Sequence, residues 1–172
     1  MNSSVSMPRD VAISYSKYLN QNLDETIDFM LNGQIRNSTD RKKLIPEIIL
    51  NWGEHYNSWK KFTGVPRLFI KYENLKLDIE SEINKIINFF HENYNLELSN
   101  KKIKIKNVIE STSIKKLQEK EGVIGFSENL ENKGPNFFRK GKIDQWKNEL
   151  NNKQNMLILN KFNIELKELN YL

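Results

Sequence analysis

The chain has 172 residues, of which 38% are hydrophobic and 28% are charged, so it suits one folded domain rather than a disordered tail. It contains no cysteine, which excludes disulfides, thiolate metal sites and cysteine nucleophiles. The sequence has no long apolar window and no signal-peptide pattern, so we expect no membrane span and a cytoplasmic location. A net charge of +5 favours an anionic ligand only weakly.

Two helices are predicted near the N-terminus. Pro8 suits the first position of a helix and an acidic residue follows in its first turn, so the pattern predicts a helix over residues 8–19. Asn22 and Glu25 have the spacing of a capping box, and the next apolar residues share one face until Gly33. A second, short helix is therefore expected before that glycine.

A longer helix and a strand are predicted next. Ser38 or Thr39 can cap an apolar stretch with helical spacing that runs to about Phe62. Glycine and proline at positions 64–66 break this helix, and the apolar run at 68–72 is typical of a buried strand. No other segment predicts a strand as clearly.

The second half of the chain is predicted to be helical around one long loop. Apolar residues recur at helical spacing over 79–90 and predict a helix there. The alternation of lysine and isoleucine at 101–106 is compatible with a strand, but the apolar residues up to 109 suit a helix at least as well, and we take the segment as a helix. Three glycines and a proline mark a loop at 122–135. A short helix is expected at 143–150, and the apolar residues from Met156 onwards predict a last, long helix.

Three neighbouring residues have a chemistry that suits a phosphate. Arg139 offers a planar fork of N–H donors, Lys140 a point charge, and Gly141 a backbone that a ligand can approach closely. On physical grounds alone a solvated basic turn is the simpler interpretation of these three residues. The rest of the chain decides between the two.

Four segments of the chain carry a resemblance to a known family. They are Met7-Pro-Arg-Asp-Val-Ala-Ile-Ser-Tyr15, Ile70-Lys-Tyr-Glu-Asn-Leu75, Ser111-Thr-Ser-Ile-Lys-Lys116 and Phe137-Phe-Arg-Lys-Gly-Lys-Ile-Asp-Gln-Trp-Lys-Asn148. In this order they resemble the signatures of the cytosolic-type sulfotransferases, which transfer a sulfuryl group from 3′-phosphoadenosine 5′-phosphosulfate (PAPS). Asp144 and Gln145 stand where that family usually has Gly-Asp, so one tight turn is expected to differ.

The resemblance implies an α/β fold of the P-loop-NTPase-like sulfotransferase type. Residues 1–172 would form a single, partial sulfotransferase domain that is truncated at its N-terminus, mostly helical and poor in strands. It would lack the family's 5′-phosphosulfate loop and the region of the catalytic histidine. The implied reaction is sulfuryl transfer from PAPS to a hydroxyl or amine of a small-molecule, glycan or lipid acceptor, without a metal.

The resemblance also implies a set of nucleotide-binding residues. Those matching positions at the 3′-phosphate are Ser14, Arg139, Lys140 and Gly141. Those matching positions at or beside the adenosine are Tyr72, Thr112, Ser113 and Ile114. Because Ser14 lies in a predicted helix and Tyr72 at a predicted strand end, ordinary structural roles are the alternatives for these two.

No catalytic residue is expected in this chain. Neither His55 nor His91 matches the family's base, and no glycine-rich phosphate loop occurs among the 172 residues. The isolated chain is therefore predicted to be inactive. Expected partners are PAPS, the acceptor, and either a polypeptide supplying the missing N-terminal half or a second copy of the chain.

Two other functions are compatible with the sequence. The chain could be a non-catalytic module that binds a 3′-phosphoadenosine nucleotide or a partner protein. A basic nucleic-acid binder ranks last, because the lysines at 101–106 alternate with isoleucine and no aromatic residues are interleaved with them. We therefore expect no nucleic-acid partner.

Overall fold

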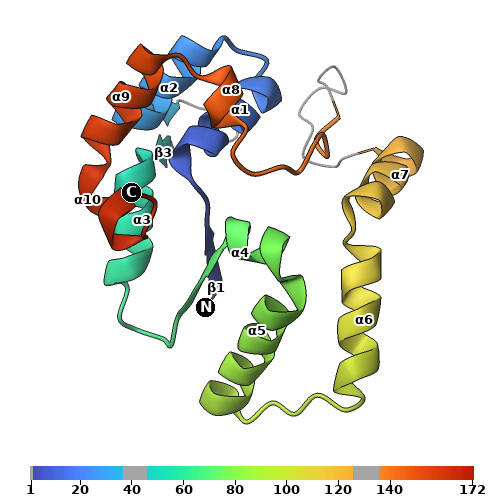
Figure 1. Cartoon of the computed structure of the whole chain (residues 1–172). Coiled ribbons are helices and arrows are strands. Elements are labelled where there is room, and N and C mark those ends of the chain that lie inside the picture. The colour runs from blue at the N-terminus through green and yellow to red at the C-terminus, as the bar shows by residue number, and fades with distance from the viewer. Residues whose placement is uncertain (1, 37–45, 126–135) are drawn as a thin grey trace. The chain divides into compact units, whose positions relative to one another are not determined.

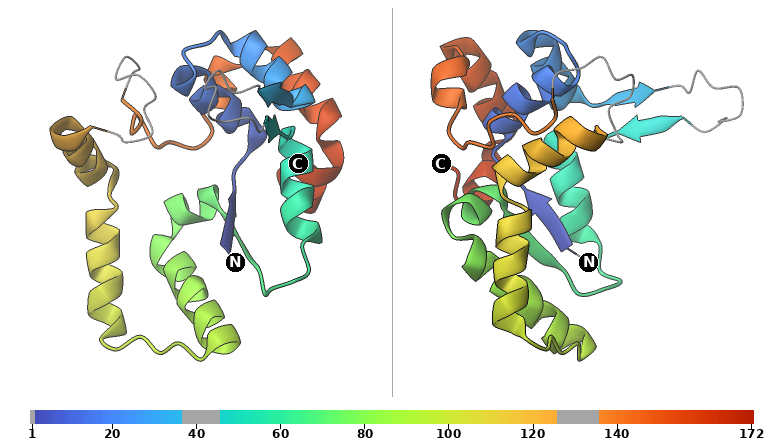
Figure 2. Two further views of the ribbon diagram at one scale, coloured as in Figure 1. Left: turned by 180° about the vertical axis from the view of Figure 1, so that it is seen from behind. Right: turned by 90° about the vertical axis from the view of Figure 1, so that its right-hand side faces the viewer.

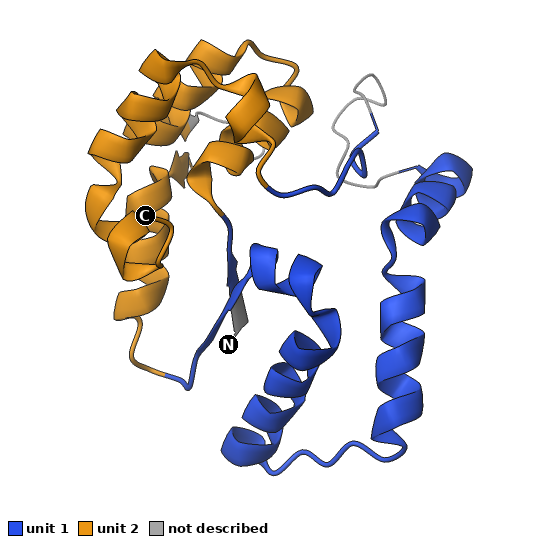
Figure 3. Ribbon diagram, in the orientation of Figure 1, with its two compact units in different colours: residues 1–6, 65–143 blue, residues 7–64, 144–172 orange. Residues whose placement is uncertain are grey.

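The structure is a computed structural model that describes residues 2–36, 46–125 and 136–172 (Figure 1). The chain divides into two compact units, each built from segments that are distant in sequence (Figure 3). Unit 1 comprises residues 1–6 and 65–143, and unit 2 comprises residues 7–64 and 144–172. Within the described residues, no helix is long and apolar enough to cross a membrane.

Unit 1 is built on two short parallel strands. Strand β1 (Asn2–Val5) pairs with β4 (Leu68–Lys71), so that Asn2 lies opposite Leu68. The predicted strand at 68–72 is confirmed and ends one residue early, because Tyr72 begins a helix. Its partner β1 was not predicted, since a four-residue Asn-Ser-Ser-Val segment has no alternating apolar pattern.

Four helices follow β4 in unit 1: α4 (Tyr72–Leu77), α5 (Ile79–Tyr94), α6 (Lys101–Ser111) and α7 (Ile114–Ile124). The helices predicted at 79–90 and 101–109 are confirmed as α5 and α6. Gly122 lies within α7, so the predicted loop cannot begin there, and α7 ends at Gly125, where φ is +72°. The remainder of that loop, residues 126–135, is outside the described residues.

Unit 2 holds most of the buried apolar side chains among the described residues. Helix α1 (Pro8–Tyr18) packs on α2 (Leu23–Asn32), and both contact α9 (Asn152–Lys161). The core cluster consists of Met7, Ala12, Ile27, Met30, Ile158, Phe162 and Leu166. The first two predicted helices are thus confirmed. So is the Asn22 cap, whose side chain accepts the Glu25 N–H at 2.8 Å.

The predicted helix from about residue 39 to Phe62 is wrong in its first half. Strand β3 (Glu47–Ile49) pairs antiparallel with β2 (Gln34–Arg36), and the pair extends beyond α2 and α3 as a narrow ribbon (Figure 2). Helix α3 (Trp52–Lys61) begins only after Asn51, which forms a capping box with Glu54. The two adjacent β-branched residues before this cap favour the extended form. Ser38 and Thr39 are outside the described residues.

The C-terminal helices are shorter than predicted. Helix α8 (Trp146–Glu149) occupies only part of the segment 143–150. The predicted last helix is divided at Phe162 into α9 and α10 (Asn163–Glu168). Phe162 is 2% exposed and its φ of −110° departs from helical geometry, so this apolar side chain is buried at the bend.

Candidate nucleotide-binding site

The segment Arg139-Lys140-Gly141, which we call the basic turn, lies in unit 1 and begins at the end of a bend over residues 137–139. The Arg139 N–H donates to the Phe137 carbonyl at 3.0 Å. Gly141 has a φ of +55°, a left-handed conformation that costs a residue with a β-carbon about 1 kcal/mol. A β-carbon at this position would also stand 3.3 Å from Ile114 Cδ1. Conformation and space therefore both favour glycine here.

The start of α7 lies against this turn. Ile114 is the first residue of the helix, and the Ser113 hydroxyl caps it by accepting the Lys116 N–H at 3.4 Å. The Thr112 hydroxyl donates to the Val108 carbonyl at 2.7 Å. Both hydroxyl-bearing residues are exposed, so each hydroxyl oxygen can also meet a ligand.

Tyr72 begins α4 at the carboxyl end of β4 and is half-buried. From the same helix, Lys76 Nζ would stand 3.6 Å from a β-carbon on Gly141. Helix α4, the start of α7 and the basic turn are thus all parts of unit 1. Seven of the eight predicted residues belong to this unit, and the contacts of Gly141 bring α4 and α7 to the turn.

The eighth residue, Ser14, belongs to unit 2. It occupies an exposed position on α1, away from the buried side of that helix. A surface hydroxyl on a helix is available to a ligand, and it is also an ordinary feature of a helix. Its role in binding stays a prediction.

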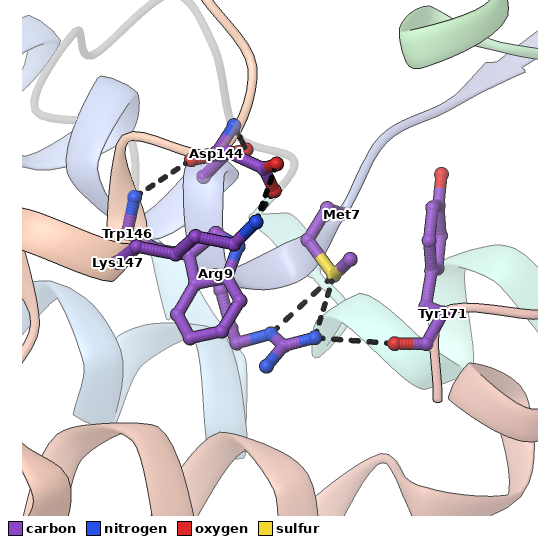
Figure 4. A network of polar contacts seen from close by, with 7 residues as sticks. Met7, Arg9, Asp144, Trp146, Lys147 and Tyr171 are labelled. Atoms are coloured by element: carbon purple, nitrogen blue, oxygen red, sulfur yellow. Dashed lines mark hydrogen bonds and ion pairs between the residues drawn. The ribbon is translucent and has the colours of Figure 1, made fainter.

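Two residues at the start of α1 organise the segment that follows the turn (Figure 4). The buried Asp10 carboxylate accepts the backbone N–H of Asp144 at 2.7 Å and that of Trp146 at 3.0 Å. The Arg9 guanidinium lies 3.8 Å from the centroid of the Trp146 ring and donates to the Tyr171 carbonyl at 3.2 Å. Sequence reasoning gave neither residue a functional role, although both lie within a motif that it quoted.

Asp144 stands where the related motif has glycine, and it adopts a φ of +63°. The left-handed conformation is therefore kept without a glycine, which aspartate tolerates better than most residues. Its side chain accepts from Lys147 Nζ at 2.7 Å and from the Trp146 indole N–H at 3.3 Å. The hydrogen bond from Lys147 is the main cause that lowers the pKa of Asp144.

Burial has the opposite effect on Asp10. It raises the pKa of this carboxyl above its ordinary value, against the N–H groups of Trp146 and Asp144, which favour the charged form. Asp10 therefore carries a desolvation cost when ionised, and hydrogen bonds from the backbone of residues 144–146 offset part of it.

The two histidines lie at exposed positions on helices. The Trp59 indole N–H donates to His55 Nε2 at 3.1 Å on α3, and His91 lies on α5. In the part of the chain that the structure describes, no group of three His, Cys, Asp or Glu side chains could hold a metal ion.

A family model described as the sulfotransferase domain matches residues 6–169. The chain belongs to the sulfotransferase family. It is 26% identical over 152 residues to Sulfotransferase 1E1 of Mus musculus, a match that covers 81% of this chain and 45% of that protein. The chain thus spans about half the length of this curated relative.

Solved structures of the sulfotransferase fold resemble nearly all of the chain. Mouse sulfotransferase SULT7A1 complexed with PAP gives a TM-score of 0.69 at 22% identity, covering 96% of this chain and 58% of that one. Retinol dehydratase in complex with androsterone and the inactive cofactor PAP gives a TM-score of 0.69 at 20% identity, and the match covers 98% of this chain and 47% of that one. The predicted fold class is therefore confirmed: an α/β sulfotransferase fold that is mostly helical, with few strands.

Proposed function

We propose that this chain is the part of a sulfotransferase that binds the 3′-phosphoadenosine of PAPS. The reaction of the whole protein would be transfer of the sulfuryl group to a hydroxyl or amine of a small-molecule, glycan or lipid acceptor. Family membership supports this proposal, as do the PAP complexes of the two similar structures. The proposal assigns Ser14 and the turn to the 3′-phosphate, and Tyr72 and residues 112–114 to the adenosine.

One observation carries the proposal for this chain's own residues. Gly141 and Ile114 are 27 positions apart in the sequence, and a β-carbon on Gly141 would contact Ile114 Cδ1 at 3.3 Å. Two of the segments that the family resemblance singles out therefore meet in unit 1. A bound nucleotide whose phosphate lies on the turn would have the start of α7 beside it.

The chemistry of the turn fits a phosphate dianion. Arg139 is half-buried and can hold two phosphate oxygens through its planar fork, while the exposed Lys140 adds a second positive charge. The missing β-carbon at Gly141 makes room for Ile114, and Lys76 Nζ adds a further positive charge on the same side. These residues bind and orient the donor, and PAPS itself supplies the sulfuryl group.

We further propose that the 172 residues alone do not turn over PAPS. Sulfuryl transfer needs positive groups around the transferring oxygens and a base for the acceptor proton, each worth about 10²-fold or more in rate. No segment of this sequence matches the family positions that supply them. A further segment or polypeptide carrying the 5′-phosphosulfate lysine and the base would complete the enzyme.

Calorimetry tests the nucleotide assignment directly. We expect the chain to bind adenosine 3′,5′-bisphosphate more tightly than AMP, and we expect Arg139→Ala to remove about 1.5–3 kcal/mol of that difference. The matched control is Lys153→Ala, which removes an exposed positive charge from α9 in unit 2. Equal binding of the two nucleotides by the unaltered chain would contradict the proposal.

A turnover assay separates the enzyme from its alternative. If PAPS is consumed only when the complementing segment is added, the chain is part of a sulfotransferase. If nucleotide binding is strong and no complementing segment restores turnover, the non-catalytic binding module is the better description. Turnover by the chain alone that disappears in His55→Ala or His91→Ala would overturn the inactivity that we expect.

A further inference from the structure

Helix α7 contacts the backbone just before the basic turn through a buried carboxylate. Glu121 is 8% exposed, and its two carboxylate oxygens accept the N–H of Phe137 at 2.6 Å and the N–H of Phe138 at 3.1 Å. Both partners lie in unit 1 with α7. A single side chain thus fixes two consecutive backbone amides immediately upstream of Arg139.

One helical turn earlier, Gln118 makes the complementary contacts. Its amide nitrogen donates to the Phe138 carbonyl at 2.9 Å and to the Arg139 carbonyl at 2.6 Å. Positions three apart on a helix lie on the same face, so Gln118 and Glu121 address the segment together. Glu121 accepts from backbone N–H groups, and Gln118 donates to backbone C=O groups.

The hydrogen bond to the Arg139 carbonyl also orients the next amide. The peptide bond is planar, and no cis peptide occurs among the described residues, so the Lys140 N–H points opposite to the Arg139 carbonyl. Gln118 therefore directs this N–H away from α7. Ile114, at the start of the helix, then packs beside Gly141. Helix α7 therefore lies along the segment 137–141, and the helix and the segment run in opposite directions.

From these contacts we propose that Gln118 and Glu121 are positioning residues that hold the Arg139-Lys140-Gly141 turn in its anion-binding form. The proposal rests on the proposed function, because it assigns the turn to the 3′-phosphate. Neither residue touches the nucleotide in this account. Each acts through the backbone that presents Arg139 and the amide of Lys140.

Replacing Glu121 by glutamine tests the proposal, because the lost negative charge and the lost hydrogen bond to the backbone predict opposite changes in phosphate binding. Glu121→Gln removes a negative charge near an anion site, which on electrostatic grounds alone would tighten phosphate binding. The same change turns one of two acceptor oxygens into an N–H donor, which faces a backbone N–H. If the placement of the turn by Glu121 has a larger effect than its charge, 3′-phosphate binding weakens although the net charge becomes more positive.

The experiment measures the ratio of the dissociation constants for AMP and adenosine 3′,5′-bisphosphate by calorimetry on the whole chain. We expect Glu121→Gln to reduce this ratio by about tenfold or more, and Gln118→Ala to reduce it by about threefold or more. The control is Glu119→Gln, on the exposed side of α7 where Glu119 pairs with Lys116, and it should leave the ratio within about twofold.

The outcomes distinguish a failure of the proposed function from a failure of the positioning role. A ratio of one in the unaltered chain defeats the proposed function. A clear ratio in the unaltered chain that is unchanged or larger in both variants overturns the positioning role alone. If Glu121→Gln fails to fold, Gln118→Ala decides the question, since Gln118 is exposed and its loss leaves the helix backbone intact.

Discussion

The two units differ in what holds their segments in place. Of the thirteen buried apolar residues among the described part of the chain, ten belong to unit 2 and three, Val5, Ile70 and Ile105, belong to unit 1. Both units also bury carboxylates, Glu82 and Glu121 in unit 1 and Asp10 in unit 2. Because burial of apolar surface is the main stabilising term in folding, unit 2 has a core of its own, whereas unit 1 has few buried apolar side chains among the described residues.

Both units hold a piece of the same backbone stretch through a carboxylate that accepts two N–H groups, Glu121 for residues 137 and 138 and Asp10 for residues 144 and 146. The basic turn lies between these two anchors in the sequence. The unit with the larger apolar core therefore holds one end of the stretch, and the unit with few buried apolar side chains among the described residues holds the other.

The largest effect is expected from Phe162 in the core of unit 2. Phe162→Ala should lower the free energy of unfolding by about 3–5 kcal/mol, because it removes a 2%-exposed aromatic side chain from the cluster. Urea unfolding measures this loss. Ile164→Ala, two residues along at a 77%-exposed position, should change stability by less than about 0.5 kcal/mol. Similar losses in the two variants would mean that the core is not where the structure has it.

A smaller effect is expected from Ile105, the buried residue of α6 in unit 1. Ile105→Ala should cost about 2 kcal/mol, at the low end for such a change, since α6 buries no other residue and Ile105 is not part of the main core cluster. Hydrogen exchange should show faster exchange in α6 with little change in α9. An equal loss of protection in both helices would show that the two units unfold together and that unit 2 does not have a separate core.

The smallest of the three effects concerns the Asp10 anchor and its pH dependence. Asp10→Asn should cost about 1–2 kcal/mol at neutral pH, because an amide can accept from only one of the two N–H groups. Burial raises the pKa of Asp10 in the folded chain. Its protonation therefore favours folding: this contribution is full below the ordinary aspartate value and is lost as the pH rises through the raised pKa.

Urea titrations of the unaltered chain and of Asp10→Asn at several pH values between 4 and 7 check this sign. The stability of the unaltered chain relative to the variant should fall as the pH increases through that window. A relative stability that rises with pH would mean that the hydrogen bonds from Asp144 and Trp146 outweigh burial, and that the pKa of Asp10 is lowered.

Sequence patterns predicted the elements whose signals are local. The helix that begins at Pro8 and the cap at Asn22 depend on residues within one or two turns, and both are as predicted. Strand β1 depends on pairing with a strand 66 positions away, which no local pattern reveals. In the segment before α3, the apolar spacing suited a helix, and the capping box at Asn51 marked the true start.

The residues of the candidate site also divide into those that the sequence indicates and those that only the fold reveals. The motif residues from Tyr72 to Gly141 were singled out by family resemblance, which needs no structure. Gln118 and Glu121 were not, because polar residues on a helix ordinarily indicate a solvated face. Only the fold brings their side chains to a backbone segment 16 to 21 positions further along the chain.

The stacking of Arg9 on Trp146 gives the chain a built-in optical probe. The sequence has three tryptophans, of which Trp146 lies five positions after Gly141 and contacts both the Arg9 guanidinium and the Asp144 carboxylate. Trp52 instead packs against Phe162, and Trp59 against His55. Replacing these two by phenylalanine leaves a single tryptophan, whose emission, excited selectively beyond the absorption of the six tyrosines, reports the surroundings of Arg9 and Asp144 without any attached label.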